Sequence, residues 1–401
     1  MRISTAQMFQ QNSYSIAKGQ SETSKILEQL ATGKKINTAG DDPVAAIGID
    51  KLTQQNNLVD QYLRNIDYGE NHLNQTETLL GDLDNLAGSM KEQLLRGSNG
   101  SMTDNERQTI ADEMQKTLDQ MLAIANKKDE SGNYLFAGNK TGSAPFEFDA
   151  NGQIIYNGDS GTRESIIASG VLTDTNMPGD AVFMNALNAM GDYSANYMAG
   201  QQGEFSVDSA KMTDQANHVA DTYQFSFTDN GSGGVDVEVR DSANNVLTTV
   251  SDFDSSMPIN VNGMEVKLEG QPMAGDSFTL EPMQEVSIFD SFSQAIALLE
   301  SGDKIQTPQG KAELAQLLNN IDSGVNQMSA KRGEVGNSLK VMDQYKSNHT
   351  DEKVINASAL SMLEDLDYAE AIIEFEKQQL ALNAVSSVFS KVGSTSLFDY
   401  I

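Results

Sequence analysis

Residues 29–49 read QLATGKKINTAGDDPVAAIGI, and the break in this stretch decides how the chain begins to fold. Gly40 permits a tight turn, and the side chains of Asp41 and Asp42 can accept hydrogen bonds from backbone amides. Pro43 suits the first position of a helix because the amide hydrogen it lacks would have no helical partner there. The stretch therefore predicts a helix, an inter-helix turn built on these four residues, and a second helix.

The two ends of the chain are predicted to be helices with narrow apolar stripes. The first helix runs from Thr5 to Ala31, and its apolar residues recur at intervals of three, four and seven, as in a coiled coil. The last runs from about Glu352 to Val392. We predict that the two stripes form an assembly seam, which consists of Phe9, Ile16, Leu27, Leu30, Ile372, Phe375, Leu382, Val385, Phe389 and Val392.

These stripes are too thin to fold the ends of the chain alone. Burial of the few large apolar side chains of each helix contributes less favourable free energy than the loss of backbone entropy costs when the helix becomes ordered. We therefore expect the terminal helices to become ordered only when neighbouring subunits cover the seam.

Long helices are also predicted on both sides of the centre of the chain. One runs from about Val44 to Leu95 with an apolar stripe along one face. Thr103 and Glu106 have the spacing of a capping box for the helix that follows. Pro308 begins another long helix, whose apolar residues keep three-four spacing over many turns.

The centre of the chain changes to the two-residue period of β-strands. Short strands are predicted between residues 147 and 167, and a longer β-rich stretch runs from about Tyr223 to Leu280. Within that stretch, Asn262-Gly263 is a residue pair that favours a two-residue hairpin turn. We expect this stretch to form a separate small β domain.

Together these elements predict an α+β fold. It is an elongated rod of long antiparallel helices, a terminal coiled coil plus a helical bundle with β-hairpins, with an inserted small β domain. Three domains are expected: a terminal coiled-coil domain (residues 1–45 and 360–401), a helical and β rod domain (46–185 and 286–359) and an outer β-rich domain (186–285).

The composition argues against several classes of function. A net charge of −30 and a pI near 4.3 disfavour nucleic-acid binding, which requires clustered Lys and Arg. The absence of Cys removes disulfides and thiol chemistry. No apolar run approaches the roughly 18 residues of a membrane helix, so no membrane insertion is expected. The start of the chain lacks the pattern of a cleaved signal peptide.

No arrangement of residues indicates catalysis, a cofactor or a metal site, and the protein is predicted not to be an enzyme. His72, His218 and His349 are far apart in the sequence, and we expect surface or packing roles for them. The pair Asp252 and Asp254 fits a solvated loop better than a cation site. The glycine-rich run 231–234 precedes no helix, so a hairpin connection is expected instead of a phosphate loop.

Two stretches at opposite ends of the chain resemble the paired signatures of the bacterial flagellin superfamily. Residues 29–49 resemble the N-terminal signature, and residues 363–390, LEDLDYAEAIIEFEKQQLALNAVSSVFS, resemble the C-terminal one. Within the superfamily the chain most resembles the hook-filament junction family, through the opening MRISTAQMF, the DDPVAA turn and the stretches NYLFAGNKTGSAPF and IIYNGDSG. The family segment consists of Tyr134, Leu135, Phe136, Ala137 and Gly138.

This resemblance implies a structural subunit of the flagellum that lies between the first hook-associated protein and the flagellin filament. The implied partners are further copies of the chain in a ring, the first hook-associated protein, flagellin, and a flagellar export chaperone that holds the C-terminal helix from Ile372 to Val392. The implied location is extracellular, reached through the flagellar type III export system without a cleaved signal peptide.

Three other functions remain open on the sequence. The nearest is filament flagellin itself, which differs in its place of assembly. A cytoplasmic coiled-coil scaffold or chaperone-like module would also account for the long helices. Finally, the β-rich insert could carry an adhesive or glycan-binding function.

Overall fold

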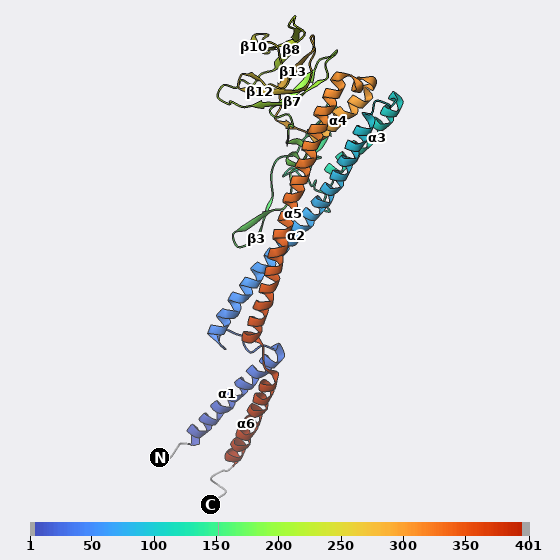
Figure 1. Cartoon of the computed structure of the whole chain (residues 1–401). Helices are drawn as coiled ribbons and strands as arrows, with labels where there is room; N and C mark the ends of the chain where they lie inside the picture. The colour runs from blue at the N-terminus through green and yellow to red at the C-terminus, as the bar shows by residue number, and fades with distance from the viewer. Residues whose placement is uncertain (1–4, 151, 395–401) are drawn as a thin grey trace, which may run out of the picture. The chain divides into compact units, whose positions relative to one another are not determined.

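The computed structural model describes residues 5–150 and 152–394, and the chain divides into two compact units. The terminal unit combines residues 1–64 with residues 345–401, and the central unit comprises residues 65–344. Six α-helices account for most of the chain (Figure 1). They are α1 (Thr5–Thr32), α2 (Pro43–Gly97), α3 (Asp104–Ala125), α4 (Ile288–Glu300), α5 (Pro308–Glu364) and α6 (Tyr368–Ser394).

Several helices begin where the sequence has residues that can cap the first free amides of a helix. The carboxylate of Asp42 accepts hydrogen bonds from the first free amides of α2, and Thr103 and Glu106 form the predicted capping box at α3. Ser287 caps α4 by accepting from the amide of Asp290. The predicted helices of this part of the chain are therefore confirmed.

The predicted start of the last helix near Glu352 is wrong. No residue between Met342 and Glu364 breaks a helix, and α5 continues through this stretch. The break falls at Asp365–Asp367, where the carboxylate of Asp367 accepts from the amides of Ala369 and Glu370 and so caps α6. The spacing of Asp367 and Glu370 is a start signal that was present in the sequence.

The helical part of the central unit has a continuous apolar core. The predicted stripe of α2 is buried from Ile66 to Leu94, and so are Ile110, Met114 and Leu118 of α3. α3 also packs against α4, whose buried residues include Phe289 and Phe292. The core of this unit is therefore closed by helices from both halves of the chain.

Fourteen short strands lie between α3 and α4 among the residues that the structure describes. Three antiparallel pairs join β1 (Phe146–Phe148) to β2 (Ile154–Tyr156), β3 (Glu164–Ala168) to β4 (Val171–Asp174), and β5 (Ala186–Leu187) to β14 (Glu285–Val286). The remaining strands are β6 (Tyr193–Tyr197), β7 (Phe205–Met212), β8 (Tyr223–Asp229), β9 (Val235–Arg240), β10 (Val246–Val250), β11 (Ile259–Val261), β12 (Met264–Gly270) and β13 (Ser277–Pro282).

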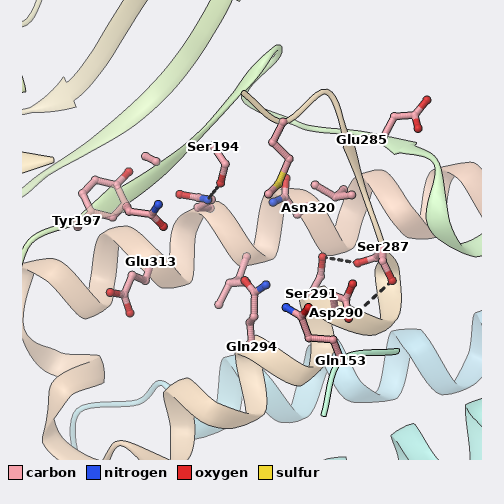
Figure 2. A pocket seen from close by; sticks show the side chains of 16 residues that line it. Gln153, Ser194, Tyr197, Glu285, Ser287, Asp290, Ser291, Gln294, Glu313 and Asn320 are labelled. Atoms are coloured by element: carbon pink, nitrogen blue, oxygen red, sulfur yellow. Dashed lines mark hydrogen bonds between the residues drawn. The ribbon is translucent and has the colours of Figure 1, made fainter. Parts of the chain in front are cut away.

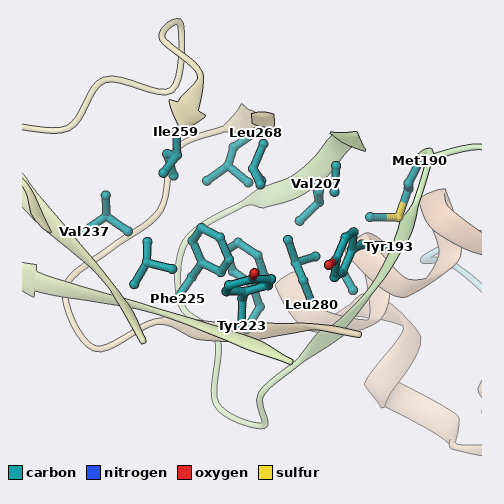
Figure 3. Close-up of a cluster of buried hydrophobic side chains, with 14 of the residues drawn as sticks. Met190, Tyr193, Val207, Tyr223, Phe225, Val237, Ile259, Leu268 and Leu280 are labelled. Carbon is teal, nitrogen blue, oxygen red and sulfur yellow. The ribbon is translucent and has the colours of Figure 1, made fainter. Parts of the chain in front are cut away.

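These eight strands form two antiparallel sheets, in the orders β10-β9-β8-β13-β6 and β11-β12-β7. Their apolar faces share one core, to which Phe225, Leu268 and Leu280 belong (Figure 3). The rings of Phe225 and Phe278 stack in it with centroids 4.6 Å apart. Asn262 and Gly263 both have positive φ, 44° and 71°, and turn the chain from β11 to β12 as predicted.

Two strands of this region, β6 and β7, were not predicted. β6 reads YSANY, in which small and polar residues hide the alternation, although Tyr193, Ala195 and Tyr197 point into the core. β7 begins with the alternating pair Phe205 and Val207 but continues into a polar segment. Their pairing with β13 and β12 shows that neighbouring strands, and not their own pattern, specify them.

The burial of His72 on α2 has a consequence for the stability of the central unit that can be measured. It is buried, its ring stacks on Tyr68, and its Nε2 lies 3.1 Å from the guanidinium of Arg163. Burial, together with the charge of Arg163, lowers the pKa of His72 to about 4. The unfolded chain therefore binds a proton at His72 between about pH 6.5 and pH 4 that the folded chain does not.

We expect the free energy of unfolding of the central unit to fall as the pH is lowered from about 6.5 to about 4, with a contribution from His72 of up to about 3 kcal/mol. His72→Gln should remove this contribution. Urea unfolding followed by circular dichroism across this pH range measures the difference between the two proteins. Equal pH slopes in wild type and variant would contradict the assignment.

Candidate assembly interface

The inter-helix turn between α1 and α2 is held by two carboxylates. Asp41 accepts hydrogen bonds from the amides of Asn37 and Thr38 and pairs with Lys25 at 2.7 Å. These contacts, first that of Lys25, hold the pKa of Asp41 well below its usual range. Asp42 caps α2, whose first residue is Pro43. The sequence assigned the capping role correctly, and Gly40 lies in the turn between the helices.

The turn is also connected to the break between α5 and α6. The amide of Lys35 donates to the carbonyl of Glu364, and the amide of Leu366 donates to the carbonyl of Gly33. The side chains of Lys34 and Glu364 form an ion pair. The two breaks in the helices of the terminal unit therefore lie side by side and are linked by backbone hydrogen bonds.

α1 and α6 pack against each other in antiparallel orientation (Figure 1). Gly19 lies against Leu382, and Gly33 lies against Tyr368 at the other end of the pair. Most of the half-buried or buried positions on both helices follow the alternating three-four spacing of a coiled coil. They are Asn12, Ile16, Gly19, Thr23, Ile26 and Leu30 on α1, and Ala371, Phe375, Gln378, Leu382 and Val385 on α6. Glu22 and Gln29 of α1 are also half-buried.

Half of the predicted assembly seam lies on this contact. Ile16, Leu30, Phe375, Leu382 and Val385 are half-buried between the two helices. Phe9, Leu27 and Ile372 are 56%, 48% and 48% exposed within one chain, so their place in a seam that neighbouring subunits cover stays a prediction. The side chains of Phe389 and Val392 fall outside the described residues.

The sequence prediction missed most of the small and polar members of this contact. Gly19 lets the helices approach closely, since a Cβ there would lie 2.9 Å from the Leu382 side chain. Asn12 and Gln378 occupy positions that an apolar search passes over, whereas Thr23 is found because it lies seven residues from Ile16. Extending the three-four spacing set by the apolar residues along each helix, whatever residue stands at each position, would have found them.

The rest of the terminal unit is a second antiparallel helical contact, between the start of α2 and the end of α5. Asn356 is buried, and its amide donates to Asn56 at 3.0 Å. The rings of Tyr62 and His349 stack with centroids 5.3 Å apart on one side of this pair. Lys353 and Asp60 form an ion pair at 2.7 Å. Polar layers of this kind specify the register of a coiled coil at a cost in stability.

The terminal unit has almost no buried apolar core. Among its described residues, Val59 and Ala371 are the only buried apolar side chains. By contrast, large apolar side chains are exposed on all four of its helical segments. They are Phe9, Tyr14, Leu27, Val44, Ile47, Leu58, Val354, Ile355, Met362, Tyr368, Ile372, Ile373, Leu380 and Val388. Exposed apolar surface of this extent is typical of interaction surfaces.

The family segment is part of the core of the central unit. Leu135, Phe136 and Ala137 are fully buried, and the ring of Phe136 contacts that of Phe183 edge-on. Gly138 has φ of 65°, and a Cβ there would lie 2.0 Å from the Asp159 carbonyl oxygen. Tyr134 is half-buried at the edge of this packing.

The family segment packs against residues 154–161, IIYNGDSG, which also carry the resemblance to the junction family. The hydroxyl of Tyr156 donates to the carbonyl oxygens of Phe136 and Asp159, both at 2.9 Å. Burial raises the pKa of this hydroxyl above its usual value, so it remains a donor. The carboxylate of Asp159 accepts from the amides of Asn139 and Gly161. These two motifs therefore stabilise one another inside the fold.

The residues considered for chemistry have structural roles. His218 lies 3.0 Å from the Tyr193 hydroxyl and 3.2 Å from the Asn262 carbonyl, and His349 packs on Tyr62. The segment 231–234 connects β8 to β9. Within residues 5–150 and 152–394, no cluster of His, Asp and Glu has the arrangement of a metal site, Asp252 and Asp254 included.

The fold defines the class of protein: an α+β chain whose first and last helices pair with each other and whose β-strands lie in the middle of the sequence. Family models for the bacterial flagellin N-terminal and C-terminal helical regions match residues 3–141 and 318–401. The chain belongs to the bacterial flagellin superfamily.

Its relatives include flagellar hook-associated protein 3 of Salmonella typhimurium, 34% identical over 147 residues, which are 37% of this chain and 46% of that protein. The chain thus spans about half the length of the curated hook-associated relatives that it matches. Flagellin B of Vibrio anguillarum is 25% identical over 92% of this chain and 90% of its own. The flagellar junction protein FlgL of Legionella pneumophila is similar in structure, with a TM-score of 0.67, 28% identity, and coverage of 79% of this chain and 99% of that one.

None of the helices in the described part of the chain combines the length and apolar character needed to span a membrane. The exposed apolar residues of the terminal unit are distributed over the sides of several helices instead of forming a continuous run. This distribution fits contacts with other helices.

The asparagine pair gives a test of the terminal unit. Asn356→Leu should leave the Asn56 amide without its partner and destabilise the local helical contact by about 1–3 kcal/mol. The double variant Asn56→Leu with Asn356→Leu should recover this loss, because no buried amide remains unpaired. Hydrogen exchange of the amides near residues 56 and 356 measures both effects.

Asn57→Leu on the exposed side of α2 is the matched control and should leave the exchange rates unchanged. If the single Asn356→Leu variant exchanges as slowly as wild type, the asparagine pair does not contribute to the contact.

Proposed function

We propose that this chain is a structural subunit of the bacterial flagellum that forms the junction between the hook and the flagellin filament. The observation that carries the proposal is the terminal unit, whose helices pair with each other yet leave large apolar side chains exposed on every helical segment. Covering them in water requires neighbouring protein surfaces. The likeness to the junction protein FlgL over nearly the whole of that chain indicates which assembly supplies these surfaces.

The proposed partners are those of a junction. Further copies of the chain would form a ring, with the first hook-associated protein on one side and flagellin on the other. The exposed apolar residues of α1 and α6, such as Phe9, Leu27 and Ile372, would contact the neighbouring copies. The role is mechanical, and no enzymatic activity is proposed.

Each of the three domains is assigned a place in the proposed junction. Residues 1–45 and 360–401 would form the inner coiled-coil layer, residues 46–185 and 286–359 the lateral contacts, and residues 186–285 an outer β-rich domain. The acidic net charge suits a surface that remains in solvent.

Export would precede assembly. A chain that must travel unfolded through the flagellar type III channel needs ends that are not stably folded before assembly, and the nearly coreless terminal unit meets this requirement. An export chaperone would hold α6, whose large apolar side chains, where the structure describes them, are half-buried or exposed in the single chain. The proposed location is the extracellular flagellum, without cleavage of a signal peptide.

Filament flagellin is the second candidate, because flagellin B is similar over 90% of its length. The junction is favoured by the higher identity to hook-associated protein 3 and by the structural likeness to FlgL. Self-assembly of the purified chain into long filaments would favour the flagellin function instead.

Deletion of the gene tests the junction function. We expect cells with hooks but without filaments, and unpolymerised flagellin in the medium, because filament subunits would lack their attachment layer. Electron microscopy of cells and a flagellin immunoblot of the medium measure the two effects. Restoration of filaments by the wild-type gene is the control, and persistence of normal filaments in the deletion strain would overturn the proposal.

Leu382→Glu tests the terminal seam. It places a carboxylate against Gly19 between α1 and α6, where burial of a charge is unfavourable. We expect loss of incorporation into flagella and at least a tenfold loss of motile cells, with an unchanged circular dichroism melting curve for the central unit. Gln379→Glu, an equal charge change at an exposed position of the same helix, is the control and should retain more function. Normal motility of Leu382→Glu would contradict the role of the seam.

A further inference from the structure

A polar cavity of about 430 Å³ lies in the central unit where β6, the start of α4 and the first half of α5 come together (Figure 2). Its volume is in the range of about 300–1,000 Å³ that is usual for small-molecule sites. Neither the hook-filament function nor the packing of the terminal unit requires it. The side chains around it come from segments on both sides of the β-rich region.

The chemistry of the lining is dominated by carboxamides, with three carboxylates and no cation. Lys, Arg and His are absent from the residues that line the cavity. The carboxylates belong to Glu285, Asp290 and Glu313, and the hydroxyls to Ser194, Tyr197, Ser287 and Ser291. The carboxamides, which both donate and accept hydrogen bonds, belong to Gln153, Asn196, Gln294, Gln316 and Asn320.

This lining selects against anions and for neutral hydroxyl-rich molecules. Three carboxylates line the cavity, and of these Glu313 is paired at 2.8 Å with Lys304, which lies outside the lining. The excess of negative charge disfavours phosphate and carboxylate groups and strengthens hydrogen bonds donated by hydroxyls. Each hydroxyl of a sugar is both donor and acceptor, as each carboxamide is. The cavity therefore matches a neutral sugar better than a charged metabolite or an apolar molecule.

Part of the lining is fixed in place before any ligand is present. Asn320 is 5% exposed, and its Oδ1 accepts from the amide of Ala189 at 3.2 Å, which orients its Nδ2 group. The Nε2 of Gln316 donates to the Ser194 hydroxyl at 2.7 Å, while its buried Oε1 has no partner among the described residues. Such an unsatisfied buried amide atom is unusual in a core that needs no ligand or water.

The opposite side of the cavity is more open. Figure 2 shows Gln153, Asp290 and Gln294 close together there, on the loop before β2 and on α4. Asp290 is half-buried and accepts from the amide of Ile154 at 3.4 Å. The carboxamides of Gln153 and Gln294 are exposed, so both can turn toward a ligand.

We propose that this cavity binds a neutral sugar, either free or as a unit of a glycan, through the fixed amides of Asn320 and Gln316 on one side and through Gln153, Asp290 and Gln294 on the other. A single sugar unit should bind with a dissociation constant on the order of 1 mM, because few atoms make the contacts. A glycan that places one unit in the cavity would bind through the same groups.

Saturation-transfer NMR on the full chain with glucose, galactose and N-acetylglucosamine tests the proposal. At least one of the three should receive magnetisation, and the signal should fall at least fivefold in the double variant Gln153→Ala with Gln294→Ala. Gln215→Ala removes an exposed carboxamide outside the cavity and should leave the signal unchanged. Neither glutamine of the double variant is part of the buried core, and its melting curve checks that it is folded.

Glucuronate and glucose 6-phosphate are the charged comparisons and should bind more weakly than glucose. The proposal is overturned if none of the neutral sugars gives a signal, if the double variant binds as well as wild type, or if the charged sugars bind equally well or better. An oligosaccharide that binds more tightly than its single unit would identify a glycan as the source of the sugar.

Discussion

The terminal unit depends on one constraint: two paired helices share a single line of contact, and their remaining sides stay exposed. In α1 and α6 this line is occupied by Ile16, Leu30, Phe375 and Leu382, diluted by Gly19 and by polar residues. Large apolar side chains on other sides of the helices are exposed in the single chain. Because burial of apolar surface is the main favourable term in folding, the stability of this unit is linked to the surfaces around it.

Polar interactions supply the geometry that the apolar contacts leave undetermined. Asp41 and Lys25 hold the turn after α1, and backbone hydrogen bonds join it to the break before α6. The pairing of Asn56 with Asn356 fixes the register farther along. Such directed interactions contribute less free energy than a core does, yet they define one arrangement among several that weak apolar contacts would permit.

The central unit, in contrast to the terminal unit, is stabilised by apolar cores of its own. Its helices close over a continuous core, and its β region has a core of its own, built on stacked and edge-on aromatic rings. The family segment around Phe136 belongs to this packing, since it is buried and hydrogen-bonded to Tyr156. A motif that marks a family can therefore reflect the requirements of folding as much as those of contact with partners.

The sequence by itself determined the helices, their caps and the hairpin turn at Asn262-Gly263, because these depend on short-range spacing and on the backbone preferences of single residues. It also indicated that the ends carry too few apolar residues to form a core. Tertiary structure decided which sides of α1 and α6 meet, and so left Leu27 and Ile372 each 48% exposed. It also decided the strands β6 and β7 and the polar cavity beside α4 and α5, because each arises from residues that are far apart in the chain and meet only when it is folded.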